Sequence, residues 1–306
     1  MTLQDPLIAT LLEILVGLIA GLLGGLLGIG GSVIMIPSLA IIFGSRDPST
    51  QHLYQASAMA VNVAVSVPAS IRHWRAGATH TRLLKLVLPA ALVSIVAGVL
   101  LSNMIDGRFL RLVFALFLLY VAGTLFLKAT RKHPDLHPDH ERVTPARGGL
   151  VGLIMGSAAG LLGVGGGVLA VPAAQTLCKV PLRNAIAVSS TAMCITASIG
   201  ATIKITTLPE HGHPAMEALR IALIMTPSAI LGGWWGARLT HVLPVHVVRW
   251  VLLILLLVAA WRMAISSRPA DQASLASQAP ISTCCLTHTP HVVRDADWCG
   301  LCATRA

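Results

Sequence analysis

Hydrophobic residues form long runs along most of the chain, and short polar segments separate these runs from one another. A helix needs about 20 apolar residues to cross a bilayer, and several runs approach or exceed that length before residue 265. The pattern therefore predicts an all-α polytopic membrane protein. We expect its helices at about 7–28, 32–44, 55–72, 84–104 and 109–128, and then at about 148–178, 185–205, 216–240 and 245–265.

One glycine-rich stretch occurs twice. Residues 17–37 have the sequence GLIAGLLGGLLGIGGSVIMIP, residues 152–172 have GLIMGSAAGLLGVGGGVLAVP, and 12 of the 21 aligned positions are identical. The offset is 135 residues, and shorter matches such as Pro89 with Pro227 continue through the later helices. A repeat of this extent indicates duplication of a whole structural unit. We predict two homologous halves of about four transmembrane helices each, at 1–128 and 148–265, with a polar linker at 129–147 and a tail at 266–306.

Each copy begins with glycines at every fourth position, such as Gly17 and Gly21 in the first copy. This spacing leaves a bare groove on one helix face, where a second helix can approach closely. Each copy then reaches a glycine cluster, and glycine disfavours a continuous helix by up to about 1 kcal/mol per residue relative to alanine. We therefore expect paired broken helices, each made of a grooved helix, an unwound elbow at 28–31 or 163–167, and a half-helix.

The paired elbows indicate a binding site. Unwound backbone inside a bilayer is tolerated only where it is buried in protein or lines a cavity, and interruptions at matching positions of two halves mark transporter binding sites. A half-helix directs its N-terminal N–H groups and the positive end of its dipole at the elbow, which suits an anion. The alternative is that the glycines serve only tight helix packing.

These two glycine stretches, each ending near a proline, resemble the TauE/SafE family of sulfite exporters. The resemblance covers roughly residues 5–265, with one departure at Ser32, where the second copy has Gly167. It implies an integral membrane transporter that exports a small anion such as sulfite or an organosulfonate. Transport would proceed by alternating access around the two broken helices.

Composition supports the membrane assignment. The chain is 55% hydrophobic and 11% charged, with a mean hydropathy of +0.78, whereas an ordinary soluble domain is about 25% charged. The net charge of +10 comes largely from segments between apolar runs, as positive-inside topology produces. No signature of nucleic-acid binding is present. The expected location is a bacterial inner membrane, and the expected partners are the lipid bilayer and a small anion; homo-oligomerisation is left open.

Candidate anion-binding residues lie in the elbows and in the helices that follow them. The elbows offer backbone N–H donors, and the helices offer hydroxyls and an amide, which are costly in hydrocarbon unless they face a cavity or a partner helix. The hydroxyls have an alternative role, because serine and threonine can bond to their own helix backbone. The predicted substrate-binding set is Gly28, Gly30, Gly31, Ser32, Ser57, Asn62, Gly163, Gly165, Gly166, Gly167, Ser189, Ser190 and Thr191.

Three charged residues in the predicted helices have two interpretations each. Arg72 and Lys204 occupy matching helix ends, where they either attract anions or, as we favour, anchor the helices at the membrane interface. Glu13 is the only carboxylate in the first apolar run. A proton-coupling role for it is open, and a position near the membrane surface is favoured.

Basic residues give part of the topology. Segments 72–85 and 128–147 hold four and five Arg or Lys residues, which places both in the cytoplasm. In the second half, basic residues occur on both candidate sides. The two halves are parallel if each broken helix crosses the bilayer once, and inverted if each is a hairpin; the sequence leaves this open.

Two other classes fit less well. A membrane enzyme usually carries clustered His, Asp or Glu beside its helices, but the histidines lie mostly in the linker, loops and tail, so we expect neither catalysis nor a cofactor. A scaffold subunit of a larger complex would explain the glycine grooves but not the matched elbows. Cysteines in the tail, with His288 and His291, offer zinc or copper ligands, but they lack paired CxxC spacing, which favours an unstructured tail without metal.

Overall fold

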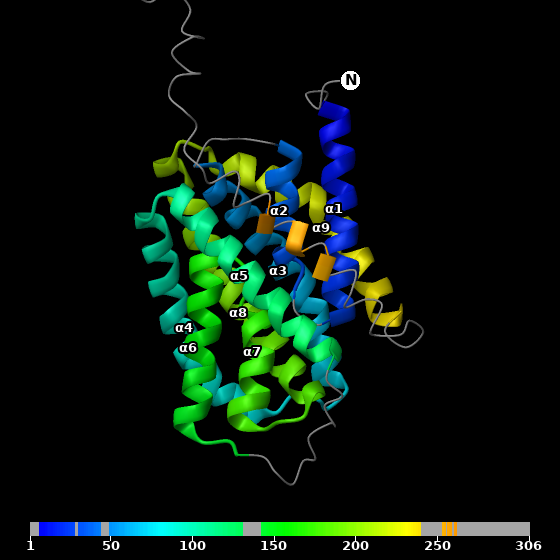
Figure 1. Cartoon of the computed structure of the whole chain (residues 1–306), viewed down its shortest axis with the longest axis vertical. Coiled ribbons are helices and arrows are strands. Elements are labelled where there is room, and N and C mark those ends of the chain that lie inside the picture. Colours follow the sequence, from blue (N-terminus) through cyan, green and yellow to red (C-terminus); the bar gives the residue numbers. More distant parts are fainter. Residues whose placement is uncertain are drawn as a thin grey trace, which may run out of the picture. The chain divides into compact units, whose positions relative to one another are not determined.

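The described part of the chain is mainly helical, and short turns join several of its helices (Figure 1). The computed structural model describes residues 6–27, 30–43, 49–130, 142–239, 253–254, 256–258 and 260–261. All of them belong to one compact unit that spans Met1–Arg268. Within these residues, six helices are long and apolar enough to cross a membrane. The prediction of an all-α polytopic membrane protein is confirmed.

The helices follow the predicted order, and both predicted breaks are present, between α1 and α2 and between α6 and α7. The residues before the linker form α1 (Pro6–Leu27), α2 (Ser32–Phe43), α3 (Thr50–Arg75), α4 (Thr81–Met104) and α5 (Gly107–Thr130). The residues after it form α6 (Pro145–Leu162), α7 (Gly167–Ala173), the π-helical turn η2 (Ala174–Cys178), α8 (Leu182–Thr207), the 3-10 turn η3 (Leu208–His211) and α9 (Ala215–Leu239).

Parts of the prediction fall outside the described residues. These are most of the linker, the tail from residue 266, and much of the helix predicted at 245–265, of which residues 253–254, 256–258 and 260–261 are described and helical.

Helix α3 begins five residues earlier than the sequence predicts. Its first turn is polar, but tertiary contacts stabilise the helical conformation there. The hydroxyl of Thr50 accepts a hydrogen bond from Arg111 of α5 at 2.8 Å. The ring of Tyr54 stacks on that of Phe43, with the centroids 6.3 Å apart. Such contacts override the weak preference of a polar segment for a loop.

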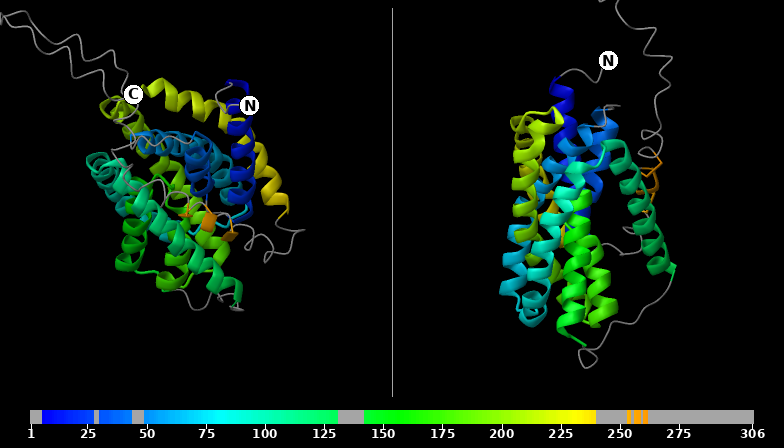
Figure 2. Two further views of the ribbon diagram at one scale, coloured as in Figure 1. Left: turned by 45° about the horizontal axis from the view of Figure 1, so that its top comes forward. Right: turned by 90° about the vertical axis from the view of Figure 1, so that its left-hand side faces the viewer.

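Glycine grooves join α1 to α9 and α6 to α4. A Cβ placed on Gly17 would overlap the carbonyl oxygen of Met225, and a Cβ on Gly21 would overlap that of Ala229. Residue numbers increase together along this contact, so α1 and α9 are parallel (dark blue and yellow in Figures 1 and 2). The α6 groove makes the matching contacts with α4, namely Gly152 with Val87, Gly156 with Ala91 and Gly160 with Ile95. The predicted role of the described glycines in close helix packing is confirmed.

Helices α3 and α8 pack in opposite directions. Lys204 of α8 contacts His52, whereas Thr191 of the same helix contacts Ser70. Short turns also reverse the chain between α3 and α4 and between α8 and α9. With α1 parallel to α9 and α6 parallel to α4, these reversals make α1 antiparallel to α6.

Candidate functional site

Each elbow reverses the chain, so that the short helix folds back against the long helix before it. Gly31 follows the end of α1 by four residues, yet a Cβ on it would lie 3.1 Å from the carbonyl oxygen of Ala20. Ala20 precedes the end of α1 by seven residues, or about 10 Å. In the second elbow, a Cβ on Gly166 would lie closer still, 2.5 Å from the carbonyl oxygen of Met155. Both broken helices are therefore hairpins.

Left-handed backbone conformations make these turns. In the first elbow, Gly30 has a φ of 80°. In the second, Gly163, Gly165 and Gly166 have φ angles of 74°, 71° and 74°. Other residues rarely adopt these angles, so the local fold requires glycine here apart from any ligand. Gly28 lies outside the described residues.

The two elbows meet at the same two side chains, Asn62 of α3 and Met193 of α8. A Cβ on Gly30 would lie 3.3 Å from Sδ of Met193 and 3.7 Å from Oδ1 of Asn62. A Cβ on Gly165 would lie 2.8 Å from the same sulfur and 2.9 Å from Nδ2 of Asn62. The structure therefore brings three of the predicted site residues together: Gly30, Asn62 and Gly165.

Two polar side chains in this region have unused hydrogen-bonding capacity. Asn62 is fully buried, and neither its Oδ1 nor its Nδ2 has a partner among the described residues. Ser32, the first residue of α2, is also fully buried, and its hydroxyl has no partner in the same part of the chain. Unpaired buried polar groups are costly, and native structures usually keep them for a reason.

Backbone donors also lie at the elbows. The N–H groups of Ile34 and Met35 donate to the carbonyl of Gly31. The N–H groups of Leu169 and Ala170 donate in the same way to Gly166. The N–H groups that precede these, at Ser32–Val33 and Gly167–Val168, have no acceptor within their own helix, because the first turn of a helix offers none.

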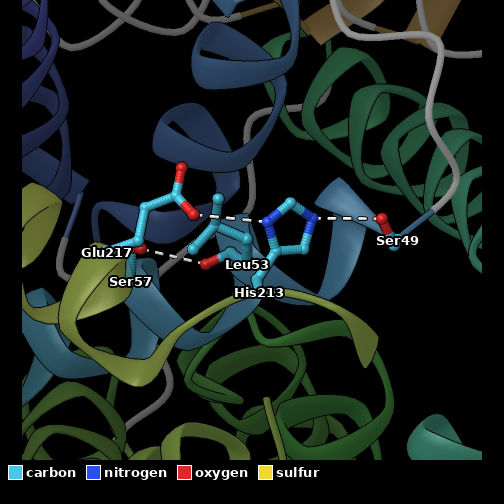
Figure 3. Close-up of polar contacts among 5 residues, drawn as sticks. All are labelled: Ser49, Leu53, Ser57, His213 and Glu217. Carbon is cyan, nitrogen blue, oxygen red and sulfur yellow. Dashed lines mark hydrogen bonds and ion pairs between the residues drawn. The ribbon is translucent and has the colours of Figure 1, made fainter. Parts of the chain in front are cut away.

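Four predicted hydroxyls are instead bonded to their own helices. The hydroxyl of Ser57 donates to the carbonyl of Leu53 at 2.9 Å (Figure 3). Those of Ser189 and Ser190 donate to Ile186, and that of Thr191 donates to Ala187. These bonds are the local alternative that serine and threonine have in helices. A ligand role for these residues stays a prediction, without a contact to the elbows to support it.

Sequence reasoning missed a row of buried amides on α3. Gln51, Gln55 and Asn62 are each fully buried, and spacings of four and seven residues put them on one helix face. Gln55 donates through Nε2 to the carbonyl oxygen of Leu161 at 3.3 Å and lies against Gly163 of the second elbow. Both side-chain polar atoms of Gln51 lack partners among the described residues. The spacing of these residues can be read from the sequence, but the predicted helix starts at about residue 55 and therefore leaves out Gln51.

The interface role favoured for Lys204 is wrong. This side chain is 1% exposed, and its Nζ donates to Ser102 at 2.9 Å and lies 3.0 Å from Nδ1 of His52. An interface anchor would be exposed at the end of its helix instead, as Arg72 is at the matching end of α3. The carboxylate of Glu13 is buried in the protein and pairs with Arg220 at 3.5 Å, and its position near the membrane surface stays a prediction.

Basic side chains gather where α4, α6 and α8 begin. The two segments predicted to be cytoplasmic meet here in a surface cavity of about 520 Å³. Its lining residues are His80, Arg82, Arg142, Val143, Thr144 and Arg147. A second cavity, of about 400 Å³, is lined by His73, Pro181, Leu182, Arg183 and Ile186. Arg183 thus joins the basic end, while Lys204 is buried and Arg220 is paired with Glu13.

The fold and the site define a class: a multi-pass α-helical membrane protein in which two glycine hairpins meet in the protein interior. Residues 13–263 match the sulfite exporter TauE/SafE family. The chain belongs to this family, and the resemblance inferred from the two glycine stretches is confirmed.

Similar proteins carry membrane-transporter names. The chain is 27% identical over 251 residues to "Probable membrane transporter protein MamO" of Magnetospirillum gryphiswaldense, covering 72% of this chain and 39% of that protein. It is 30% identical over 226 residues to a "Probable membrane transporter protein" of Methanocaldococcus jannaschii, covering 70% and 80%. A Xylella fastidiosa protein of the same description is 29% identical over 214 residues, covering 69% and 77%. The chain thus spans about two fifths of the length of MamO, and no solved structure matches it.

Proposed function

We propose that the protein transports a small oxyanion across the membrane and binds it between the two elbows. One observation carries this proposal: Gly30 and Gly165, from two separate hairpins, lie against one buried asparagine with an unpaired amide. Helix packing alone does not require an amide there. A membrane-buried polar side chain is costly unless it serves a ligand or a partner.

The chemistry of the elbows suits an anion. The oxygens of sulfite or of an organosulfonate would accept hydrogen bonds from backbone N–H groups near Ser32–Val33 and Gly167–Val168, and from Nδ2 of Asn62. The hydroxyl of Ser32 adds a further donor. The start of α2 also presents the positive end of its dipole. Glycine has no side chain to hold the anion at a distance. Family membership supports a sulfur oxyanion as the substrate class.

We further propose that two inverted repeats form this site. The support is the packing: α1 packs on α9 as α6 packs on α4, with glycines 135 residues apart meeting carbonyl oxygens 138 residues apart. The antiparallel course of α1 and α6 indicates inverted halves. Inverted repeats around a shared site provide for alternating access, in which one bundle rocks against the other.

Orientation follows from the charges. The basic end, where α4, α6 and α8 begin, carries arginines from both segments predicted to be cytoplasmic. We therefore place this end in the cytoplasm of a bacterial cell, with the protein in the inner membrane. Arginines at the entrance raise the local concentration of anions, and this supports export.

Transport by purified protein in proteoliposomes tests the proposal. Sulfite, sulfate and methanesulfonate are loaded separately, and efflux is measured by ion chromatography for the parent, Asn62→Leu and Gly149→Ala. Gly149 is the matched control, because a Cβ there meets no atom within 4 Å. We expect efflux of at least one anion from the parent and Gly149→Ala, and none through Asn62→Leu. If Asn62→Leu transports like the parent, the elbows are not the site; if the parent transports none of the three, a scaffold role gains support.

A further inference from the structure

Lys204 is a buried lysine without a counter-charge. It is 1% exposed, and its hydrogen-bonding partners are Ser102 and His52. Within the described part of the chain, no carboxylate forms an ion pair with it. An ammonium group buried without a negative partner is costly. Burial therefore favours either loss of the proton from Nζ or the presence of an anion close to it.

Two histidines lie beside the lysine, and the hydrogen bonds that their rings make depend on which ring nitrogens carry a proton. Nδ1 of His52 lies 3.0 Å from Nζ of Lys204 and can receive a proton from it. The ring of His211 packs against that of His52 at an angle of 36°, with the centroids 4.0 Å apart. Its Nδ1 and Nε2 lie 3.1 Å from the carbonyl oxygens of Thr207 and Asn103. Carbonyl oxygens only accept, so a neutral ring makes one of these bonds and an imidazolium makes both.

Other charged groups around the cluster lie on several elements. In α4, the residues at this end, Ser102 and Asn103, do not titrate. The carboxylate of Glu217, in α9, is held by His213 at 3.3 Å (Figure 3). Further titratable or charged groups that the structure describes near this end are Tyr54 of α3, Arg111 of α5 and His213 before α9. Two more carboxylates lie here, Asp106 between α4 and α5 and Glu210 beside His211, and both are exposed. Among the described residues, none of these carboxylates forms an ion pair or a hydrogen bond with Lys204.

A chain of hydrogen bonds joins this cluster to the second elbow. Nζ of Lys204 donates to Ser102, and the hydroxyl of Ser102 donates to Oε1 of Gln55 at 3.3 Å. Gln55 in turn bonds to the carbonyl of Leu161 and packs on Gly163. A change in the charge of Lys204 therefore reaches the hairpin through a continuous set of buried groups.

Building on the elbow site proposed above, we propose that Lys204 binds a proton that is transported together with the anion. With an anion bound at the elbows, Nζ is an ammonium group, and its positive charge compensates negative charge of the anion. After the anion leaves, Nζ gives its proton to Nδ1 of His52, which passes it to water, and Lys204 remains as a neutral amine. The return step on the other side takes up one proton and one anion.

The size of this coupling follows from Coulomb's law. Ten residues of α3 separate His52, beside the lysine, from Asn62, which corresponds to roughly 15 Å. With an effective dielectric constant of about 20, one unit charge at that distance changes anion affinity about sixfold. The effect is reciprocal, so a bound anion favours the protonated lysine by the same factor.

Simultaneous measurement of anion and proton fluxes tests this inference. The probes are sulfate and methanesulfonate, because both keep a fixed charge near neutral pH and carry no proton themselves. Proteoliposomes contain a pH-sensitive dye, and anion uptake is measured in the same vesicles. Lys204→Met removes the charge and keeps an unbranched side chain, Lys204→Arg keeps a permanent charge, and Lys85→Met is the control at an exposed lysine.

We expect proton movement with the anion in the parent and in Lys85→Met, and anion flux without proton movement in both Lys204 variants. The anion affinity of the parent should fall about sixfold as the pH rises, and that of Lys204→Arg should not change with pH. If Lys204→Met does not insert, Lys204→Arg carries the test. Proton movement retained in the Lys204 variants, or anion flux without protons in the parent, overturns the coupling and leaves the elbow site standing. Absence of flux in the parent for sulfite as well as for sulfate and methanesulfonate refutes the proposed function itself.

Discussion

Replacing Asn62 with leucine should make the protein more stable and inactive at the same time. The side chain is fully buried, and neither polar atom of its amide has a partner among the described residues. Leucine has nearly the same shape and lacks the polar atoms. An unsatisfied buried polar group costs about 1–3 kcal/mol, so Asn62→Leu should raise the free energy of unfolding of the anion-free protein by about that amount.

The assay compares unfolding and transport in one preparation. For a protein of this size, 1 kcal/mol corresponds to about 2–4 °C in Tm, so we expect a rise of roughly 2–12 °C in anion-free detergent solution. Added substrate should stabilise the parent and have no effect on Asn62→Leu.

Asn103→Leu is the contrasting variant, because the amide of Asn103 donates to Thr207 at 2.8 Å and its loss should lower the Tm. A lower Tm for Asn62→Leu together with parental transport would refute the reasoning, since the amide would then be part of the fold and not of a site.

Three further predictions concern packing and the tail. Gly156→Ala should destabilise the protein by about 1–3 kcal/mol, because the new methyl group would overlap the carbonyl oxygen of Ala91; Gly123→Ala, in open space, is the control, and the folded fraction after solubilisation is the measurement. Gly21→Ala should have a similar effect through Ala229, and a tolerated methyl group at either position would contradict the close approach of the helices. Truncation after Ser267 should leave insertion and anion flux unchanged, since the tail has no apolar run; loss of flux that added metal restores in the full chain would favour a metal site.

The sequence predicts the helices and their breaks because these depend on local features. An apolar run sets the length of a membrane helix, and adjacent glycines end it wherever the rest of the chain lies. The presence of glycine at every fourth residue also predicts close helix packing, which the contacts of Gly17 and Gly152 confirm. The partner helices were not predictable from this spacing, because a bare groove accepts any helix that can reach it.

The site could be predicted only as a set of candidates. Asn62 and Ser57 are equally polar and lie on the same predicted helix, but only Asn62 faces both elbows, and this depends on the rotation of α3 against its neighbours. Lys204 lies at a helix end, where sequence patterns favour the interface; its burial depends on Ser102 and His52, which come from distant parts of the chain. Gln51 was missed because the contacts that extend α3 to Thr50 are tertiary.

The parallel pairing of α1 with α9 has a consequence for biosynthesis. Met225 follows Gly17 by 208 residues, and at about 5–20 residues per second the ribosome needs roughly 10–40 seconds to make that length. The groove of α6 meets no such delay, because its partner α4 is synthesised before it. Two grooves of similar sequence therefore become packed at different times. The first faces lipid, or an insertion factor, until α9 leaves the ribosome, whereas the second can pack on α4 as soon as it enters the membrane.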